Sequence, residues 1–153
     1  MKEKICSFFG HAYIDRKEEV YQKILHTVEE LVYNEGCYEF WFGGYGEFDT
    51  LCHAIVTEIK KRCSAIRRVY CYSDEKQLLA LKRRGEISTS DYEEIKLLPL
   101  TYNYWYTRIY YRNCKMIDAS DTVIFYAESK EDSGAYKALK YAIRTKKRYV
   151  NLF

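Results

Sequence analysis

The chain has 153 residues, of which 48% are hydrophobic and 31% are charged, and its formal net charge is +3. These values are typical of one globular domain, which we expect to span residues 1–153, and no apolar stretch reaches the length needed to cross a bilayer. The small net charge argues against a nucleic-acid-binding protein, which usually carries a stronger and more clustered basic surface. Two basic clusters, at 60–68 and 144–148, fall at the ends of expected helices, where cations complement the helix dipole.

The first residues run from Met1 to Lys4 directly into an apolar stretch, without the long hydrophobic segment and cleavage site of a signal peptide. We therefore expect a cytoplasmic protein without a membrane partner. The six cysteines form no C-x-x-C pair, and the three histidines show no ligand spacing, so neither a zinc site nor a thioredoxin-type site has support. We expect no bound metal and no required cofactor.

Strands and helices alternate along the first half of the chain. Residues 15–34 form a strongly amphipathic pattern in which Val20, Ile24, Val28 and Val32 recur every four residues, as one face of a helix requires. The other expected elements are strands at 4–9, 38–42 and 68–72 and a helix at 50–62.

Residues 74–100 are the least regular part of the chain. A short helix is expected at 77–82, a polar loop at 85–91, and a short strand at 94–98, before Pro99. After them we expect a helix at 106–119, a strand at 122–127, a helix at 134–145 and a final strand at 148–152.

This alternation predicts an α/β fold. We expect a Rossmann-like three-layer α/β/α sandwich with a mostly parallel sheet of about five strands, in the order 3-2-1-4-5. In such sheets ligands bind beyond the carboxyl ends of the strands, where the strand order reverses.

The stretch from Gly43 to Asp49 carries the strongest functional signal. It follows a strand-like run and precedes a helical pattern, so three glycines (Gly43, Gly44 and Gly46) fall in a strand-to-helix turn. Glycines allow the backbone to approach a ligand closely, and a helix N-terminus favours phosphate. The alternative is a plain strand-to-helix turn, since a G-x-G without a third glycine is a weak fingerprint.

Two further loops should meet this turn at the carboxyl edge of the sheet: Gly10-His11 after the first strand and 128–134 after the strand at 122–127. All three contain glycine, and this coincidence predicts a ligand site. His11 could contact phosphate or ribose, or it could hydrogen-bond the loop backbone. Ser133 and Gly134 open the last helix and could bind a second phosphate, or they could simply start the helix.

Two groups from the middle of the chain belong to the same expected site. Asp49 is its best carboxylate, as an acceptor for a ribose hydroxyl or a general base, or as the N-cap of the second helix. Arg112 with Asn113 could make bidentate contact with phosphate, and the alternative for Arg112 is an ion pair with Asp118 or a neighbouring helix. Tyr45 belongs to the glycine turn itself.

Aromatic residues are dense between Tyr102 and Tyr111. If exposed, they could stack a base or form a partner surface. We favour packing or a homo-oligomer interface for this cluster.

Several short motifs together resemble the SLOG superfamily, and within it the YpsA-like branch of small bacterial proteins. They are Phe8-Phe9-Gly10-His11, the turn from Gly43 to Asp49, Tyr111-Arg112-Asn113 with Met116, and the tail from Ser133-Gly134-Ala135 to Leu152. The resemblance covers almost the whole chain except Asp74 to Pro99.

The resemblance implies a Rossmann-like fold that binds nucleotides or NAD-derived nucleotides such as ADP-ribose. Its implied ligand residues are Gly10, His11, Gly43, Gly44, Tyr45, Gly46, Asp49, Arg112, Asn113, Ser133 and Gly134. Relatives include the Lonely-Guy phosphoribohydrolases, sensor domains for NAD-derived signals, and the single-strand-binding domain of a DNA-uptake protein. By analogy with them a homo-oligomer is expected.

One departure bears on catalysis. Lonely-Guy enzymes carry an essential glutamate a few residues after a glycine-rich motif near the last helix, whereas Lys137 and Ala138 follow Gly134 here. We therefore expect a non-catalytic sensor or ligand-binding protein. The alternatives are a nucleotide N-glycosidase, with Asp49, Glu47 or Glu128 in place of the lost glutamate, and a single-stranded nucleic-acid-binding protein.

Overall fold

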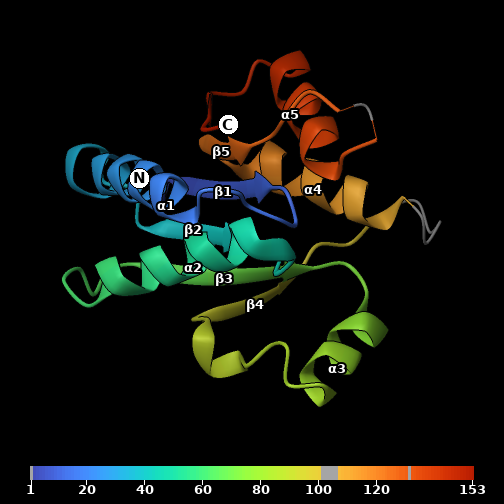
Figure 1. Ribbon diagram of the computed structural model, residues 1–153. Helices are drawn as coiled ribbons and strands as arrows, with labels where there is room; N and C mark the ends of the chain where they lie inside the picture. The colour runs from blue at the N-terminus through green and yellow to red at the C-terminus, as the bar shows by residue number, and fades with distance from the viewer. Residues whose placement is uncertain (1, 101–106, 131) are drawn as a thin grey trace.

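The computed structural model describes residues 2–100, 107–130 and 132–153 of the chain, and it contains a parallel sheet of six strands (Figure 1). Their order is β4-β3-β2-β1-β5-β6. The five main expected strands occur in the expected relative order, and the short strand expected near 94–98 is the sixth, added beside β3 at one edge. The strands are β1 (Ile5–Gly10), β2 (Glu39–Phe42), β3 (Arg67–Tyr72), β4 (Glu94–Leu97), β5 (Thr122–Tyr126) and β6 (Tyr149–Asn151).

Five α-helices connect the strands within the described ranges. They are α1 (Lys17–Glu29), α2 (Gly46–Lys60), α3 (Glu75–Arg83), α4 (Arg108–Ala119) and α5 (Gly134–Arg144). The single helix expected at 15–34 is α1 followed by a π-helical turn, η1 (Glu30–Asn34), and a short 3-10 turn, η2 (Thr89–Asp91), lies in the expected polar loop.

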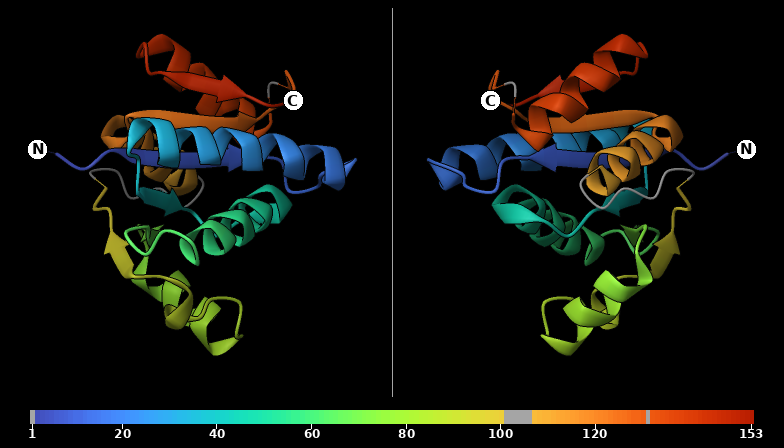
Figure 2. Two further views of the ribbon diagram at one scale, coloured as in Figure 1. Left: turned by 90° about the vertical axis from the view of Figure 1, so that its left-hand side faces the viewer. Right: turned by 90° about the vertical axis from the view of Figure 1, so that its right-hand side faces the viewer.

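The core is divided between the two faces of the sheet. Along β1, Cys6 and Phe8 point to one face and Ile5 and Phe9 to the other, as the alternation of a strand requires. The first face packs against α1, η1 and α2, and the second packs against α4 and α5. Figure 2 shows these two helix layers from opposite sides. A parallel sheet covered on both faces is the three-layer arrangement expected from the sequence.

The segment 74–100 is more ordered than its sequence suggests. Asp74 caps α3, because its side chain accepts hydrogen bonds from the backbone N–H groups of Lys76 (3.0 Å) and Gln77 (3.5 Å). Tyr70, Leu78 and Ile87 form a small third core beneath this helix. In Figure 1, α3 and β4 lie at the opposite end of the molecule from α5 and β6.

The second helix begins four residues earlier than expected. Gly46 has a φ of +91°, a value that favours glycine, and the chain turns there directly into α2. Tyr45 is the residue before the helix, so Asp49 is not the N-cap that the sequence offered as one of its two roles. Asp49 instead lies within the first turns of α2. Its carboxylate can reach back from there to residues 43–46, called the glycine loop below, which follow β2.

The aromatic cluster and the absence of a membrane span are the remaining expectations from the sequence. Tyr102 to Tyr106 of the aromatic cluster lie outside the described residues, while Tyr110 and Tyr111 lie on α4. Within the described ranges, none of the helices has the length and apolar character needed to cross a bilayer.

Candidate functional site

A cavity of about 300 Å³ opens beyond the carboxyl ends of the strands, at the point where the strand order reverses. The connections from β1 and β5 leave the sheet in opposite directions here, so two loops and the helices that follow them surround an open space. The residues around it are Phe8, Phe9, Gly10, His11, Ala12, Gly43, Tyr45, Asp49, Ile109, Arg112, Asn113, Ser133, Gly134 and Ala135.

This cavity, called cavity A below, brings together most of the site residues expected from the sequence. Gly44 and Gly46 are the exceptions, since they lie around a neighbouring cavity instead. Five further residues of cavity A had not been expected: Phe8, Phe9, Ala12, Ile109 and Ala135. Ile109 could have been found from its spacing, because residues 109, 112 and 113 share one face of a helix.

Asp49 is hydrogen-bonded to the glycine loop. Its Oδ1 accepts from the Gly43 N–H at 3.3 Å and its Oδ2 from the Gly44 N–H at 3.1 Å. These N–H groups belong to the glycine turn at which the sequence predicts a phosphate ligand. An anion that binds them must compete with a carboxylate that the chain itself supplies.

The environment of Asp49 also changes its acidity. Burial raises the pKa of Asp49 to about 7, although the Arg112 guanidinium and the two glycine N–H groups act to lower it. Among the described residues around cavity A, Asp49 has the only carboxylate. A carboxyl group that titrates near neutral pH within a cavity can hold or release a proton there.

The other two carboxylates considered from the sequence lie elsewhere. Glu47 pairs with Lys17 (Oε2 to Nζ, 3.0 Å) and accepts a hydrogen bond from the Ile14 N–H, and Glu128 pairs with Lys130 (3.2 Å). Neither lies around cavity A.

Arg112 lies between α4 and the glycine loop. Its Nη1 donates to the Gly43 carbonyl at 3.2 Å, and its Nη2 donates to Oδ1 of Asn113 at 3.0 Å. A side chain at Gly43 would place its Cβ 2.6 Å from Nη2, so the Arg112 guanidinium would have to move away from the loop. The ion pair with Asp118, considered from the sequence, does not form, and Asp118 instead accepts from the Tyr141 hydroxyl.

The third nitrogen of this guanidinium, Nε, has no acceptor among the described residues. The Arg112 Nε is buried and makes no hydrogen bond to any residue that the structure describes. Burying such a donor without a partner costs about 1–3 kcal/mol, and buried polar groups in proteins are nearly always satisfied. An oxygen atom of a bound ligand would remove this cost.

His11 connects the loops that follow β1 and β5. Its Nε2 accepts a hydrogen bond from the Glu128 N–H at 2.7 Å, and its Nδ1 lies 3.4 Å from the Ser133 hydroxyl oxygen. Burial lowers the pKa of His11, which favours the neutral ring that this accepting Nε2 requires. The backbone contact considered from the sequence is therefore present, and a contact with ligand stays a prediction.

The N-terminus of α5 forms the opposite wall. Ser133 is the N-cap, and its hydroxyl oxygen accepts from the Tyr136 N–H at 3.3 Å. The N–H groups of Gly134 and Ala135 make no hydrogen bond within the described residues, and both residues lie around cavity A. Free N–H groups at a helix N-terminus are suited to an anion.

The fold is similar to that of DNA processing protein A (DprA). The chain aligns with DprA from Streptococcus pneumoniae with a TM-score of 0.57 at 13% identity, over 96% of this chain and 49% of that one. It aligns with the Helicobacter pylori protein, whose structure concerns its single-stranded DNA binding mode, with a TM-score of 0.55 at 15% identity, over 95% and 63%. The chain therefore spans about half to two thirds of the length of these proteins, and at these identities the likeness concerns the fold. No protein-family model and no curated protein sequence matches the chain.

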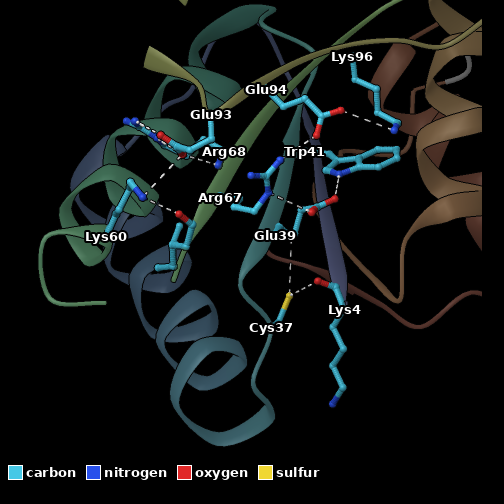
Figure 3. Close-up of polar contacts among 11 residues, drawn as sticks. Lys4, Cys37, Glu39, Trp41, Lys60, Arg67, Arg68, Glu93, Glu94 and Lys96 are labelled. Carbon is cyan, nitrogen blue, oxygen red and sulfur yellow. Dashed lines mark hydrogen bonds and ion pairs between the residues drawn. The ribbon is translucent and has the colours of Figure 1, made fainter. Parts of the chain in front are cut away.

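The basic cluster at 60–68 does not form a free cationic surface. Arg68 makes a two-point contact with Glu93, in which Nε and Nη2 donate at 3.0 and 2.8 Å. Arg67 pairs with Glu94 at 2.9 Å, and Lys60 lies 3.9 Å from Glu93 (Figure 3). Lys61 and Arg62 pair with Glu58 and Glu29. These carboxylates largely neutralise the cluster.

A metal centre has no support within the described part of the chain. No group of three or more histidine, cysteine, aspartate or glutamate side chains lies close enough to hold a metal ion there.

Proposed function

We propose that the chain binds a nucleotide or NAD-derived nucleotide in cavity A and that it does not catalyse any reaction of this ligand. The observation that carries this proposal is that three donors without a partner among the described residues belong to residues around one cavity at the strand switch point: the Arg112 Nε and the N–H groups of Gly134 and Ala135. The resemblance to the SLOG superfamily, and to its YpsA-like branch, supports the same ligand class.

Phosphate is assigned to the N-terminus of α5, opposite Arg112. The glycine loop of β2 is a poorer phosphate site than its sequence suggests, because Asp49 already occupies the N–H groups of Gly43 and Gly44. Asp49 retains lone pairs that can accept a ribose hydroxyl, and Tyr45, which is 68% exposed, offers an aromatic face at the mouth of the cavity.

Turnover is not part of the proposal, for two reasons. The first turn of α5 lacks the glutamate of the Lonely-Guy enzymes, and Glu47 and Glu128 lie away from cavity A. Asp49 alone could support a glycosidase, since its pKa of about 7 suits a general acid or base. Release of free base is therefore measured directly in the experiment below.

A second candidate function is single-stranded DNA binding, which the similarity of the fold to the Helicobacter pylori protein favours. The neutralised basic cluster at 60–68 and the net charge of +3 argue against it. Binding of this kind would weaken steeply with salt concentration.

A thermal-shift panel with AMP, NAD, ADP-ribose, cyclic ADP-ribose and a short single-stranded oligonucleotide tests these functions together. We expect at least one of the nucleotides to raise the unfolding temperature, since a ligand at about a hundred times its Kd adds roughly 2.7 kcal/mol of stability. Chromatography of the same samples should recover the ligand intact.

The panel also separates the alternatives. Free base in the samples would establish the glycosidase, and a shift with the oligonucleotide alone that disappears at high salt would establish DNA binding. The absence of a shift with every nucleotide would contradict the proposal.

A further inference from the structure

A second cavity, of about 360 Å³, adjoins cavity A on the side of α3. Gly43, Tyr45, Ile109 and Arg112 lie around both cavities, so the two are parts of one cleft along the carboxyl edge of the sheet. The remaining residues of the second cavity, called cavity B, are Gly44, Gly46, Tyr70, Gln77, Leu81, Arg84, Glu86 and Ile87.

The two cavities differ in chemistry. Cavity A alone has the N-terminus of α5, where the N–H groups of Gly134 and Ala135 make no hydrogen bond within the described residues and suit an anion. Cavity B has an apolar wall formed by Tyr70, Leu81 and Ile87, and the amide of Gln77 can both donate and accept hydrogen bonds. Arg84 pairs with Glu86 at 3.5 Å, and Asp49 accepts from the Gly44 N–H, so neither Arg84 nor Gly44 is a free partner for an anion in cavity B.

Exposed apolar side chains mark the passage between the cavities. Tyr45 is 68% exposed and Ile109 is 45% exposed, and both lie where cavities A and B meet. An aromatic ring and an aliphatic side chain at the mouth of a cleft form the kind of surface on which a planar base stacks.

We propose that cavity B holds the base of the nucleotide whose phosphate lies in cavity A. This inference rests on the proposed function and adds to it the position of the base and the segment that recognises it. Gln77, Leu81, Glu86 and Ile87 belong to α3 and the loop after it, within the stretch from Asp74 to Pro99 that the SLOG resemblance does not cover. We therefore expect selectivity for the base to depend on this stretch, which is specific to the present chain.

The test compares two probes that share a phosphate and differ in the base. AMP and ribose 5-phosphate are titrated calorimetrically into the native chain and into Gln77→Trp, which fills cavity B from an exposed position on α3. Leu79→Trp is the matched control, because Leu79 lies on the same helix, is 50% exposed, and does not lie around cavity B. Leu81→Trp provides a second obstruction of the same cavity.

In the native chain and in Leu79→Trp we expect AMP to bind at least about fivefold more tightly than ribose 5-phosphate, because stacking of one base is worth about 1–3 kcal/mol. In Gln77→Trp and Leu81→Trp this ratio should fall toward one while the affinity for ribose 5-phosphate stays unchanged. Equal affinity of the two probes for the native chain, or a ratio that survives both obstructions, would overturn the inference and leave the phosphate site intact. Failure of both probes and of every nucleotide in the panel would instead overturn the proposed function.

Discussion

Replacing Asp49 by asparagine should abolish a large part of the dependence of stability on pH between about pH 4 and about pH 7. In the folded chain Asp49 holds its proton until about pH 7, whereas an ordinary aspartate loses it near 3.8. Between these values the folded state binds more protons than the unfolded state, so the free energy of unfolding decreases as the pH rises. Over this pH range the difference in pKa lowers the free energy of unfolding of the native chain by about 4 kcal/mol in total.

The observable is the difference in the free energy of unfolding between Asp49→Asn and the native chain, measured by urea denaturation across this pH range. Asparagine can accept a hydrogen bond from only one of the N–H groups of Gly43 and Gly44, so the variant carries a cost that does not depend on pH. The difference should nevertheless move in favour of the variant as the pH rises. Asp15→Asn, at an exposed position, is the control and should follow the native curve. Parallel curves for Asp49→Asn and the native chain would show that Asp49 is ionised throughout.

Replacing Glu93 by alanine should destabilise the fold by about 3 kcal/mol, because it leaves the Arg68 guanidinium without its main partner. Arg68 is 9% exposed, and Glu93 accepts from its backbone N–H as well as from Nε and Nη2. This is the low end of the cost of breaking a buried ion pair, since the Glu93 side chain is 24% exposed. The control is Glu94→Ala, which removes the more exposed pair with Arg67 and should cost less than about 1 kcal/mol.

The Glu93 contact also has a pH signature, opposite in sign to that of Asp49. Burial acts to raise the pKa of Glu93, but the hydrogen bonds and charge of Arg68 outweigh it and lower the pKa to about 2. The stabilisation is therefore complete above the ordinary pKa of 4.5 and is lost as the pH falls toward 2. The stability of Glu93→Ala should therefore lack the part that the native chain loses as the pH falls from 4.5 toward 2. Equal costs for Glu93→Ala and Glu94→Ala would contradict the account of the pair.

The layers of the fold could be predicted because their signals are local. The four-residue spacing of Val20, Ile24 and Val28 identifies α1, and the apolar runs of the central strands identify the sheet. The pairing of β4 with β3 could not be read in the same way. Its short sequence, Glu94–Leu97, is half polar, and it is held in part by contacts between Arg68 and Glu93 that no local pattern reveals.

The candidate site, like the fold, could be predicted from the sequence only in part. The switch-point rule located the cleft, since it places the loops of Gly10, Gly43 and Gly134 at one edge of the sheet. The sequence did not reveal that Asp49 would occupy the glycine N–H groups, because that contact depends on α2 starting at Gly46. It also did not reveal cavity B, which is formed only when α3 folds against Tyr70.

The most direct test of the phosphate site uses two substitutions at Gly134. Proline at this position removes one N–H donor but suits the first residue of a helix, and Ser133 already has the extended backbone (φ −75°, ψ 131°) that a following proline requires. Gly134→Ala keeps the N–H and adds a Cβ into open space. The measurement is calorimetric titration of both variants and the native chain with the nucleotide that gives the largest shift in the panel.

We expect Gly134→Ala to bind like the native chain and Gly134→Pro to lose at least about tenfold in affinity, since a hydrogen bond to a charged group contributes about 1.5–3 kcal/mol. Both variants should unfold at temperatures close to that of the native chain. Native affinity in Gly134→Pro would contradict the assignment of phosphate to the N-terminus of α5.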